Sequence, residues 1–140
     1  MSNDETIRRT RAQELLGQVL QVEYRFIIHY PRLMDMAPDK ETRELMRLVG
    51  ESSVRHADVT AQALRTLGVV PPFPAFEALP EDPPKKIFEK QLEYEKLALM
   101  LHSEAASLVE EWQPVLQGIA DEERSHIRTV ERILERLGPG

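Results

Sequence analysis

The chain has 140 residues, long enough to bury one hydrophobic core and too short for two full catalytic domains. It contains no cysteine, which excludes disulfides, thiolate zinc sites and iron–sulfur clusters, so any bound metal must be held by nitrogen and oxygen atoms. The net charge of −6 argues against a nucleic-acid partner, because phosphate binding relies on clustered lysine and arginine. The N-terminus has no apolar signal-peptide core, and no apolar run approaches the roughly 18 residues of a membrane span. We therefore expect a soluble, cytoplasmic protein without a membrane partner.

Apolar residues recur at helical spacing in four segments and predict a single all-α domain over residues 1–140. The first helix is expected to bend at Pro31, the second to stop at Gly68, and the fourth to have Pro114 in its first turn. No stretch shows a β-strand pattern. The predicted helices cover about residues 4–36, 40–67, 85–110 and 114–137.

The segment 68–84 separates the second and third predicted helices, and it contains six prolines and no helical periodicity. Its 17 residues reach at most roughly 55 Å when extended, whereas a helix of about 28 residues is roughly 42 Å long, so the segment can cross a whole bundle. The other two connections are short, which makes each pair of helices an antiparallel hairpin. Two hairpins joined by one long crossover form the ferritin-like four-helix bundle, which is the fold that we predict.

Each predicted helix carries polar side chains in an otherwise apolar stripe, near the middle of its length. Glu123 and His126 lie about one helical turn apart, so both side chains point the same way and form a suitable ligand pair for a divalent transition metal. Buried carboxylates that lie close together need protons or cations to balance them, and a bound metal is the economical explanation. The polar candidates, in chain order, are Glu23, Tyr30, Ser53, His56, Glu95, His102, Glu123 and His126.

Simpler explanations exist for single members of this set. A lone histidine on an apolar face, such as His56, is more often a packed residue than a ligand. Glu95 lies among several glutamates, where Glu93 is a rival for the inward position, although the row of residues spaced by seven favours Glu95. Tyr30 and His102 are also explained as aromatic side chains that are hydrogen-bonded to a neighbour. The coincidence of all these residues in one predicted layer is what favours a metal site.

The residues at these positions also resemble a known family. The segment Glu23–Tyr30 resembles the first-helix motif of bacterioferritins and related ferritin-like proteins. The segment Ser53–Asp58 resembles their second-helix motif, but has a serine in place of the usual glutamate. Glu95 matches the lone third-helix glutamate, and Glu122–His126 matches the fourth-helix motif. The resemblance covers nearly the whole chain and implies a bacterioferritin-like or rubrerythrin-like di-iron carboxylate bundle.

In that family two irons, or sometimes manganese, lie in the bundle core. By position, the resemblance implies that Glu23 and His56 serve one metal. It implies that Glu95 and His126 serve the other, and that Glu123 bridges or chelates. The serine in the second helix leaves three glutamates against the four positive charges of two divalent ions.

The remaining candidates are expected to lie around these ligands. Tyr30 and His102 are predicted to support catalysis from just outside the metal ligands, with His102 about 10 Å further along the helix axis than Glu95. Glu51 is expected to point outward, so no nearby carboxylate replaces the missing one. Val54 stands where bacterioferritins have a haem-ligating methionine, and no haem is expected.

Three functions remain open at this point. An asymmetric dinuclear site would react Fe(II) with O₂ or peroxide, and a single metal at Glu95, Glu123 and His126 would have reduced or different chemistry. The third is a non-catalytic bundle that acts through protein partners. Our main prediction is an iron-handling protein or oxidoreductase with two irons, or one if the serine side has lost its metal, and with manganese or zinc as alternatives. We expect a homodimer rather than a 24-subunit shell, because no short fifth helix follows the fourth one.

Overall fold

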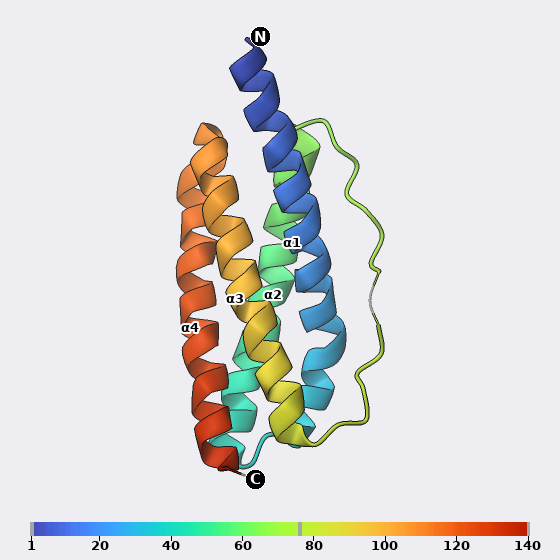
Figure 1. Cartoon of the computed structure of the whole chain (residues 1–140), viewed down its shortest axis with the longest axis vertical. Coiled ribbons are helices and arrows are strands. Elements are labelled where there is room, and N and C mark those ends of the chain that lie inside the picture. Colours follow the sequence, from blue (N-terminus) through green and yellow to red (C-terminus); the bar gives the residue numbers. More distant parts are fainter. Residues whose placement is uncertain (1, 76, 140) are drawn as a thin grey trace.

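The computed structural model describes residues 2–75 and 77–139. The helices are α1 (Asn3–Met36), α2 (Lys40–Thr66), α3 (Pro84–Leu108) and α4 (Gln113–Leu137), and a short 3₁₀ turn, η1 (Glu110–Trp112), precedes α4. The chain runs down α1 and up α2, follows a long crossover back to the other end, and then runs up α3 and down α4 (Figure 1). The predicted all-α bundle of two antiparallel hairpins joined by a long crossover is therefore confirmed.

Local chemistry explains where the helices begin and end. The Ser2 hydroxyl at the start of α1 accepts a hydrogen bond of 3.1 Å from the backbone N–H of Glu5. The Asp39 carboxylate at the start of α2 accepts one of 2.8 Å from the backbone N–H of Thr42. After α2, Gly68 has a φ angle of 83°, a left-handed conformation that glycine adopts without strain.

The end of α3 differs from the sequence expectation. Helix α3 ends at Leu108 rather than near residue 110, because Val109 is extended, with φ −124° and ψ 95°. The chain then turns through η1 into α4. Helix α1 contains Pro31 and ends at Met36, the residue at which the sequence predicted its end.

The core consists of two apolar clusters separated by a polar layer. The first cluster surrounds Leu16, Leu64, Leu101 and Leu116, and the second surrounds Leu33, Met46, Phe88 and Ile133. All four helices contribute to each cluster, so the bundle is sealed by hydrocarbon on both sides of the layer.

Side chains of α1 form polar contacts with the backbone of the crossover. The Gln21 side chain donates to the carbonyl of Phe73 at 2.8 Å and accepts from the N–H of Ala75 at 2.8 Å. About two turns further along α1, the His29 ring contacts the carbonyl of Glu77 at 2.7 Å. The crossover therefore follows α1 along the side of the bundle, as Figure 1 shows.

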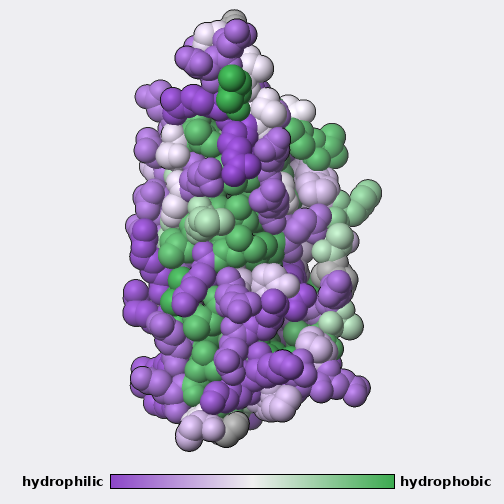
Figure 2. Space-filling view, viewed as in Figure 1, coloured by the Kyte–Doolittle hydropathy of each residue, from purple (hydrophilic) through white to green (hydrophobic). Residues whose placement is uncertain are grey.

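Charged residues cover much of the surface, and apolar residues interrupt it along the middle of the face shown in Figure 2. Helix α3 contributes exposed Leu97 and Met100. None of the helices in the described part of the chain combines the length and the apolar character that a membrane span requires.

Candidate metal centre

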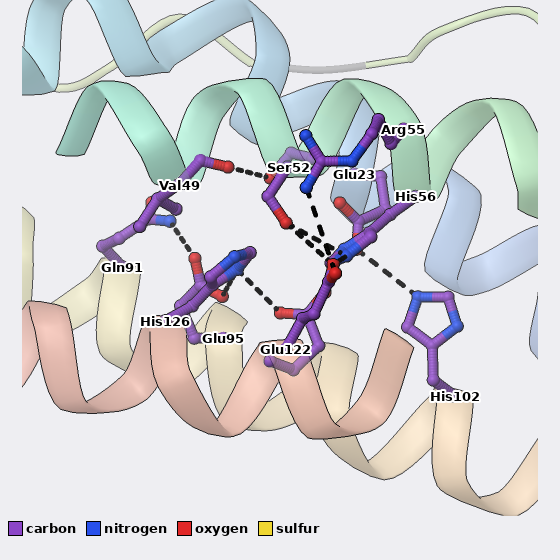
Figure 3. Close-up of polar contacts among 12 residues, drawn as sticks. Glu23, Val49, Ser52, Arg55, His56, Gln91, Glu95, His102, Glu122 and His126 are labelled. Carbon is purple, nitrogen blue, oxygen red and sulfur yellow. Dashed lines mark hydrogen bonds and ion pairs between the residues drawn. The ribbon is translucent and has the colours of Figure 1, made fainter. Parts of the chain in front are cut away.

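The polar layer contains side chains from all four helices, drawn in Figure 3. The Glu23, Glu95, Glu123 and His102 side chains are fully buried, and the His56 and His126 side chains are nearly so. Three carboxylates and three imidazoles thus occupy the interior of a small bundle, where unpaired charge is costly. The structure therefore brings together all five residues predicted as metal ligands, together with His102.

His56 lies at the centre of the layer and uses both ring nitrogens. Its Nδ1 is 2.9 Å from Glu123 Oε1 and 3.5 Å from Glu23 Oε1, so this nitrogen faces the interior. Its Nε2 faces outward, where it contacts the Glu122 carboxylate and lies 3.1 Å from the Ser52 hydroxyl. A carboxylate on the outer nitrogen fixes the ring orientation and leaves the inner nitrogen for a metal.

Glu122 was not among the predicted site residues. It is half exposed, but its carboxylate reaches the outer edge of the His56 ring, and the Ser52 hydroxyl donates to it at 3.1 Å. Arg55 lies beside it at 3.9 Å. Its position beside Glu123 in the sequence could have indicated this contact. Adjacent residues of a helix differ by about 100°, so the Glu122 side chain points away from the bundle interior and toward α2.

His126 lies beside His56 with the two rings stacked, their centroids 5.4 Å apart. Its Nδ1 is 3.4 Å from Glu95 Oε2 and 3.4 Å from Glu123 Oε2, and it forms a hydrogen bond with neither. The other oxygen of Glu95 accepts a hydrogen bond of 3.0 Å from the amide of Gln91. Gln91 therefore orients Glu95 and leaves one oxygen directed at the histidine.

His102 lies closer to the layer than the sequence suggested. Its Nε2 is 3.4 Å from Glu23 Oε1, and its ring centroid is 6.1 Å from that of His56. His102 is about two turns from Glu95 along α3. It still reaches the polar layer, because α1 runs antiparallel beside α3 and places Glu23 next to His102. His102 thus borders the space between Glu23 and Glu123.

Ser53 is fully buried, as predicted for the position of the absent glutamate. Its hydroxyl donates to the carbonyl of Val49 at 3.0 Å, a hydrogen bond within the same helix. The hydroxyl proton therefore points at the backbone and not into the polar layer. The carboxylate of Glu51 is paired with Arg47 on the surface and points outward, as expected. Helix α2 therefore provides no carboxylate to the layer.

Tyr30 lies about two helical turns along α1 from Glu23. Its ring lies against α2 where a glycine, Gly50, allows close approach; a Cβ atom there would overlap the ring. Among the described residues, no hydrogen bond joins Tyr30 to the polar layer. Its supporting role in catalysis stays a prediction.

Several polar atoms of the layer have no hydrogen-bond partner within the described chain. They include one oxygen of each buried glutamate and one nitrogen of two histidines: Glu23 Oε2, Glu95 Oε2, Glu123 Oε2, His102 Nδ1 and His126 Nδ1. Buried polar atoms are almost always paired, so a group of this size in one layer needs an explanation. Two sets of potential ligand atoms lie within 4.8 Å of one another: His56 with Glu123 and His126, and Glu23 with His102 and Glu123. The donor set and its unpaired atoms fit metal ions.

The metal-free layer balances its own charge with protons. Burial opposes a charge on His56, but hydrogen bonds to Glu123 and Glu23 outweigh it and raise the pKa of His56 to about 10. Burial likewise opposes a charge on His126, and the neighbouring glutamates raise its pKa to about 9. Burial raises the pKa of Glu95 and lowers the pKa of His102 to about 4. At neutral pH, the positive charges of protonated His56 and His126 therefore balance the buried carboxylates in place of metal ions.

A surface pocket of about 260 Å³ lies between α2 and α4. Ser52 and Arg55 line it from α2, and Glu122 and His126 line it from α4. The pocket thus connects solvent with the edge of the polar layer. His126 therefore lies beside this pocket.

No protein-family model matches the chain, and no curated protein matches it. Two solved structures are similar. A bacterioferritin from Desulfovibrio desulfuricans, described with a diiron site, has a TM-score of 0.75 and 20% identity over 98% of this chain and 85% of that chain. A ferritin-like, diiron-carboxylate protein from Bacillus anthracis has a TM-score of 0.77 and 20% identity over 96% of this chain and 99% of that chain. The protein therefore has the ferritin-like four-helix bundle fold that its sequence predicted.

Proposed function

We propose that this protein binds iron in the polar layer and oxidises Fe(II) with O₂ or peroxide. The observation that carries the proposal is the set of three fully buried glutamates, each with one oxygen that lacks a hydrogen-bond partner and lies near histidine nitrogens. The two solved structures with this fold are described as diiron proteins, which supports iron. Manganese and zinc are alternatives, because they also bind imidazole and carboxylate ligands.

The predicted ligands divide into two groups around a shared carboxylate. Glu95 and His126 would hold one ion, Glu23 and His56 the other, and Glu123 lies between them. Bound iron would supply the electrons that reduce O₂ or peroxide.

The protein's own contribution is to hold these groups and to control their protons. His56 and His126 must each lose a proton from Nδ1 before they can bind a metal. The Glu122 carboxylate retains the outer proton of His56, so the ring stays oriented while the inner proton leaves. The apolar clusters on both sides keep water from entering along the bundle, and small reactants approach through the pocket beside His126.

Anaerobic titration with Fe(II), followed by exposure to O₂, tests this function. Close to two bound ions per chain and rapid oxidation are expected for a dinuclear site, and one slowly reacting ion for a mononuclear site. The control is Glu123→Gln, which keeps the shape of the shared side chain and removes its charge, and should weaken binding of both ions. A parent protein that binds no Fe(II) would contradict the proposal.

The second candidate, a non-catalytic bundle that acts through partners, is favoured by Ser53. Its hydroxyl is bonded to its own helix, so α2 offers no fourth carboxylate. Ser53→Glu separates the two candidates because it restores the carboxylate at a buried position. A weakened dinuclear site should then bind iron in higher stoichiometry or with higher affinity, whereas a bundle whose site is lost for other reasons should bind no better than the parent.

A further inference from the structure

We propose that His102 is a direct metal ligand through Nε2, on the ion that Glu23 and Glu123 hold. The centre would then have three carboxylates and three histidines, and the third histidine would provide a ligand that α2 lacks. The inference rests on the proposed metal binding, but it concerns a residue that sequence reasoning placed outside the ligands.

The distances around His102 are compatible with shared coordination of one ion. His102 Nε2 and Glu23 Oε1 form a hydrogen bond of 3.4 Å, which is long and therefore weak for a nitrogen and an oxygen. Two ligand atoms that are each about 2.1 Å from one ion would be about 3.0 to 3.4 Å apart, for angles of about 90° to 109° between them. Potential ligand atoms of Glu23, His102 and Glu123 all lie within 4.8 Å of one another, so a modest contraction brings them around one ion.

The burial of these side chains and their unpaired oxygen atoms also support coordination by His102. The His102 and Glu23 side chains are both fully buried, and Glu23 Oε2 has no hydrogen-bond partner in the described chain. Glu123 Oε2 is likewise buried and unpartnered. An imidazole held among unpaired carboxylate oxygens in a hydrocarbon interior is well placed to share a cation with them.

His126 lies on the opposite side of the layer from Glu23, and His56 lies between the two sides. His56 Nδ1 lies closer to Glu123, at 2.9 Å, than to Glu23, at 3.5 Å. The compact ligand set that contains His56 also contains His126, with the two rings stacked. Around Glu23, His102 is therefore available as a second histidine beside His56.

Co(II) is the probe for a test on the unaltered protein, because it occupies such sites without reacting with O₂. A histidine that binds Co(II) through one nitrogen keeps an N–H on the other, and this proton gives a strongly shifted, exchangeable ¹H NMR signal. Three such signals in H₂O, absent in D₂O, are expected if His56, His102 and His126 all bind. Two signals would overturn the assignment of His102 and leave metal binding intact. No bound Co(II) would overturn both proposals.

Two matched variants identify the residue. His102→Gln should abolish one shifted signal and weaken one Co(II) site at least tenfold in calorimetric titration. His29→Gln replaces a histidine that contacts the crossover instead of the layer, and should leave both readouts unchanged. Retention of all signals and both affinities in His102→Gln would refute its role as a ligand. Adding Ser53→Glu to His102→Gln should recover the weakened site, since it returns a carboxylate to the layer.

Discussion

At the scale of single residues, Glu122 is expected to determine how well His56 binds a metal. Burial opposes its charge, but the hydrogen bond from His56 lowers the pKa of Glu122, so the carboxylate is ionised and accepts the outer ring proton. Glu122→Gln should weaken metal binding about 10- to 100-fold, the usual effect of removing the partner of a ligand histidine. Competition between the protein and a coloured chelator measures the affinity. Asp121→Asn, on the neighbouring exposed residue, is the control and should bind like the parent.

Metal uptake is expected to release protons from the polar layer. The pKa values of about 10 for His56 and about 9 for His126 mean that both rings are protonated at pH 7.5 when no metal is present. Each ring must give up one proton to bind, so affinity should rise with pH until the pH reaches about 9 to 10. Calorimetry in two buffers of different ionisation enthalpy counts the released protons. His56→Gln should release fewer protons than the parent, and equal heats in both buffers would show that the rings were already neutral.

At the scale of elements, α1 and α2 approach each other closely where Tyr30 crosses Gly50. A methyl group at this glycine would overlap the ring, so Gly50→Ala should lower the free energy of unfolding by about 1–3 kcal/mol. Gly17→Ala is the matched control, because no atom lies within 4 Å of a Cβ placed there. That change should stabilise α1 by about 0.5–1 kcal/mol through helix propensity. Urea denaturation of both variants without metal measures the difference, and equal stabilities would contradict the packing.

The helices themselves could be predicted from the sequence because each depends on local information. The spacing of apolar residues predicted which face of each helix is interior, and the prolines of residues 71–84 indicated a crossover. The same spacing put Glu23, Glu95 and Glu123 in the interior, where the structure has them.

Contacts between helices could not be predicted in the same way. The approach of His102 to Glu23 depends on how far α1 slides along α3, and the contact of Glu122 with His56 depends on how α4 is rotated against α2. No single helix contains that information. Sequence periodicity therefore identified the residues of the layer but not which of them touch.

At the scale of the whole molecule, stability should depend on pH differently with and without metal. The polar layer lies between the two apolar clusters, so its charge balance bears on the entire bundle. The folded-state pKa values of His56 and His126 lie above the unfolded value of 6.5, so the folded protein binds more protons than the unfolded chain at pH 7–9. The stability that these protons contribute is fully present below about pH 6.5 and is lost as pH rises through 9 to 10.

The Tm of the metal-free protein should therefore fall between pH 7 and pH 10. A bound divalent ion replaces those protons as the balancing charge, so the Tm of the loaded protein should fall less over the same range. Melting followed by circular dichroism, with EDTA in one series and preloaded Zn(II) in the other, compares the two forms. Surface groups titrate equally in both series and cancel in the difference. Parallel curves would mean that the layer carries no proton-dependent stability, and would also remove the charge argument for a metal.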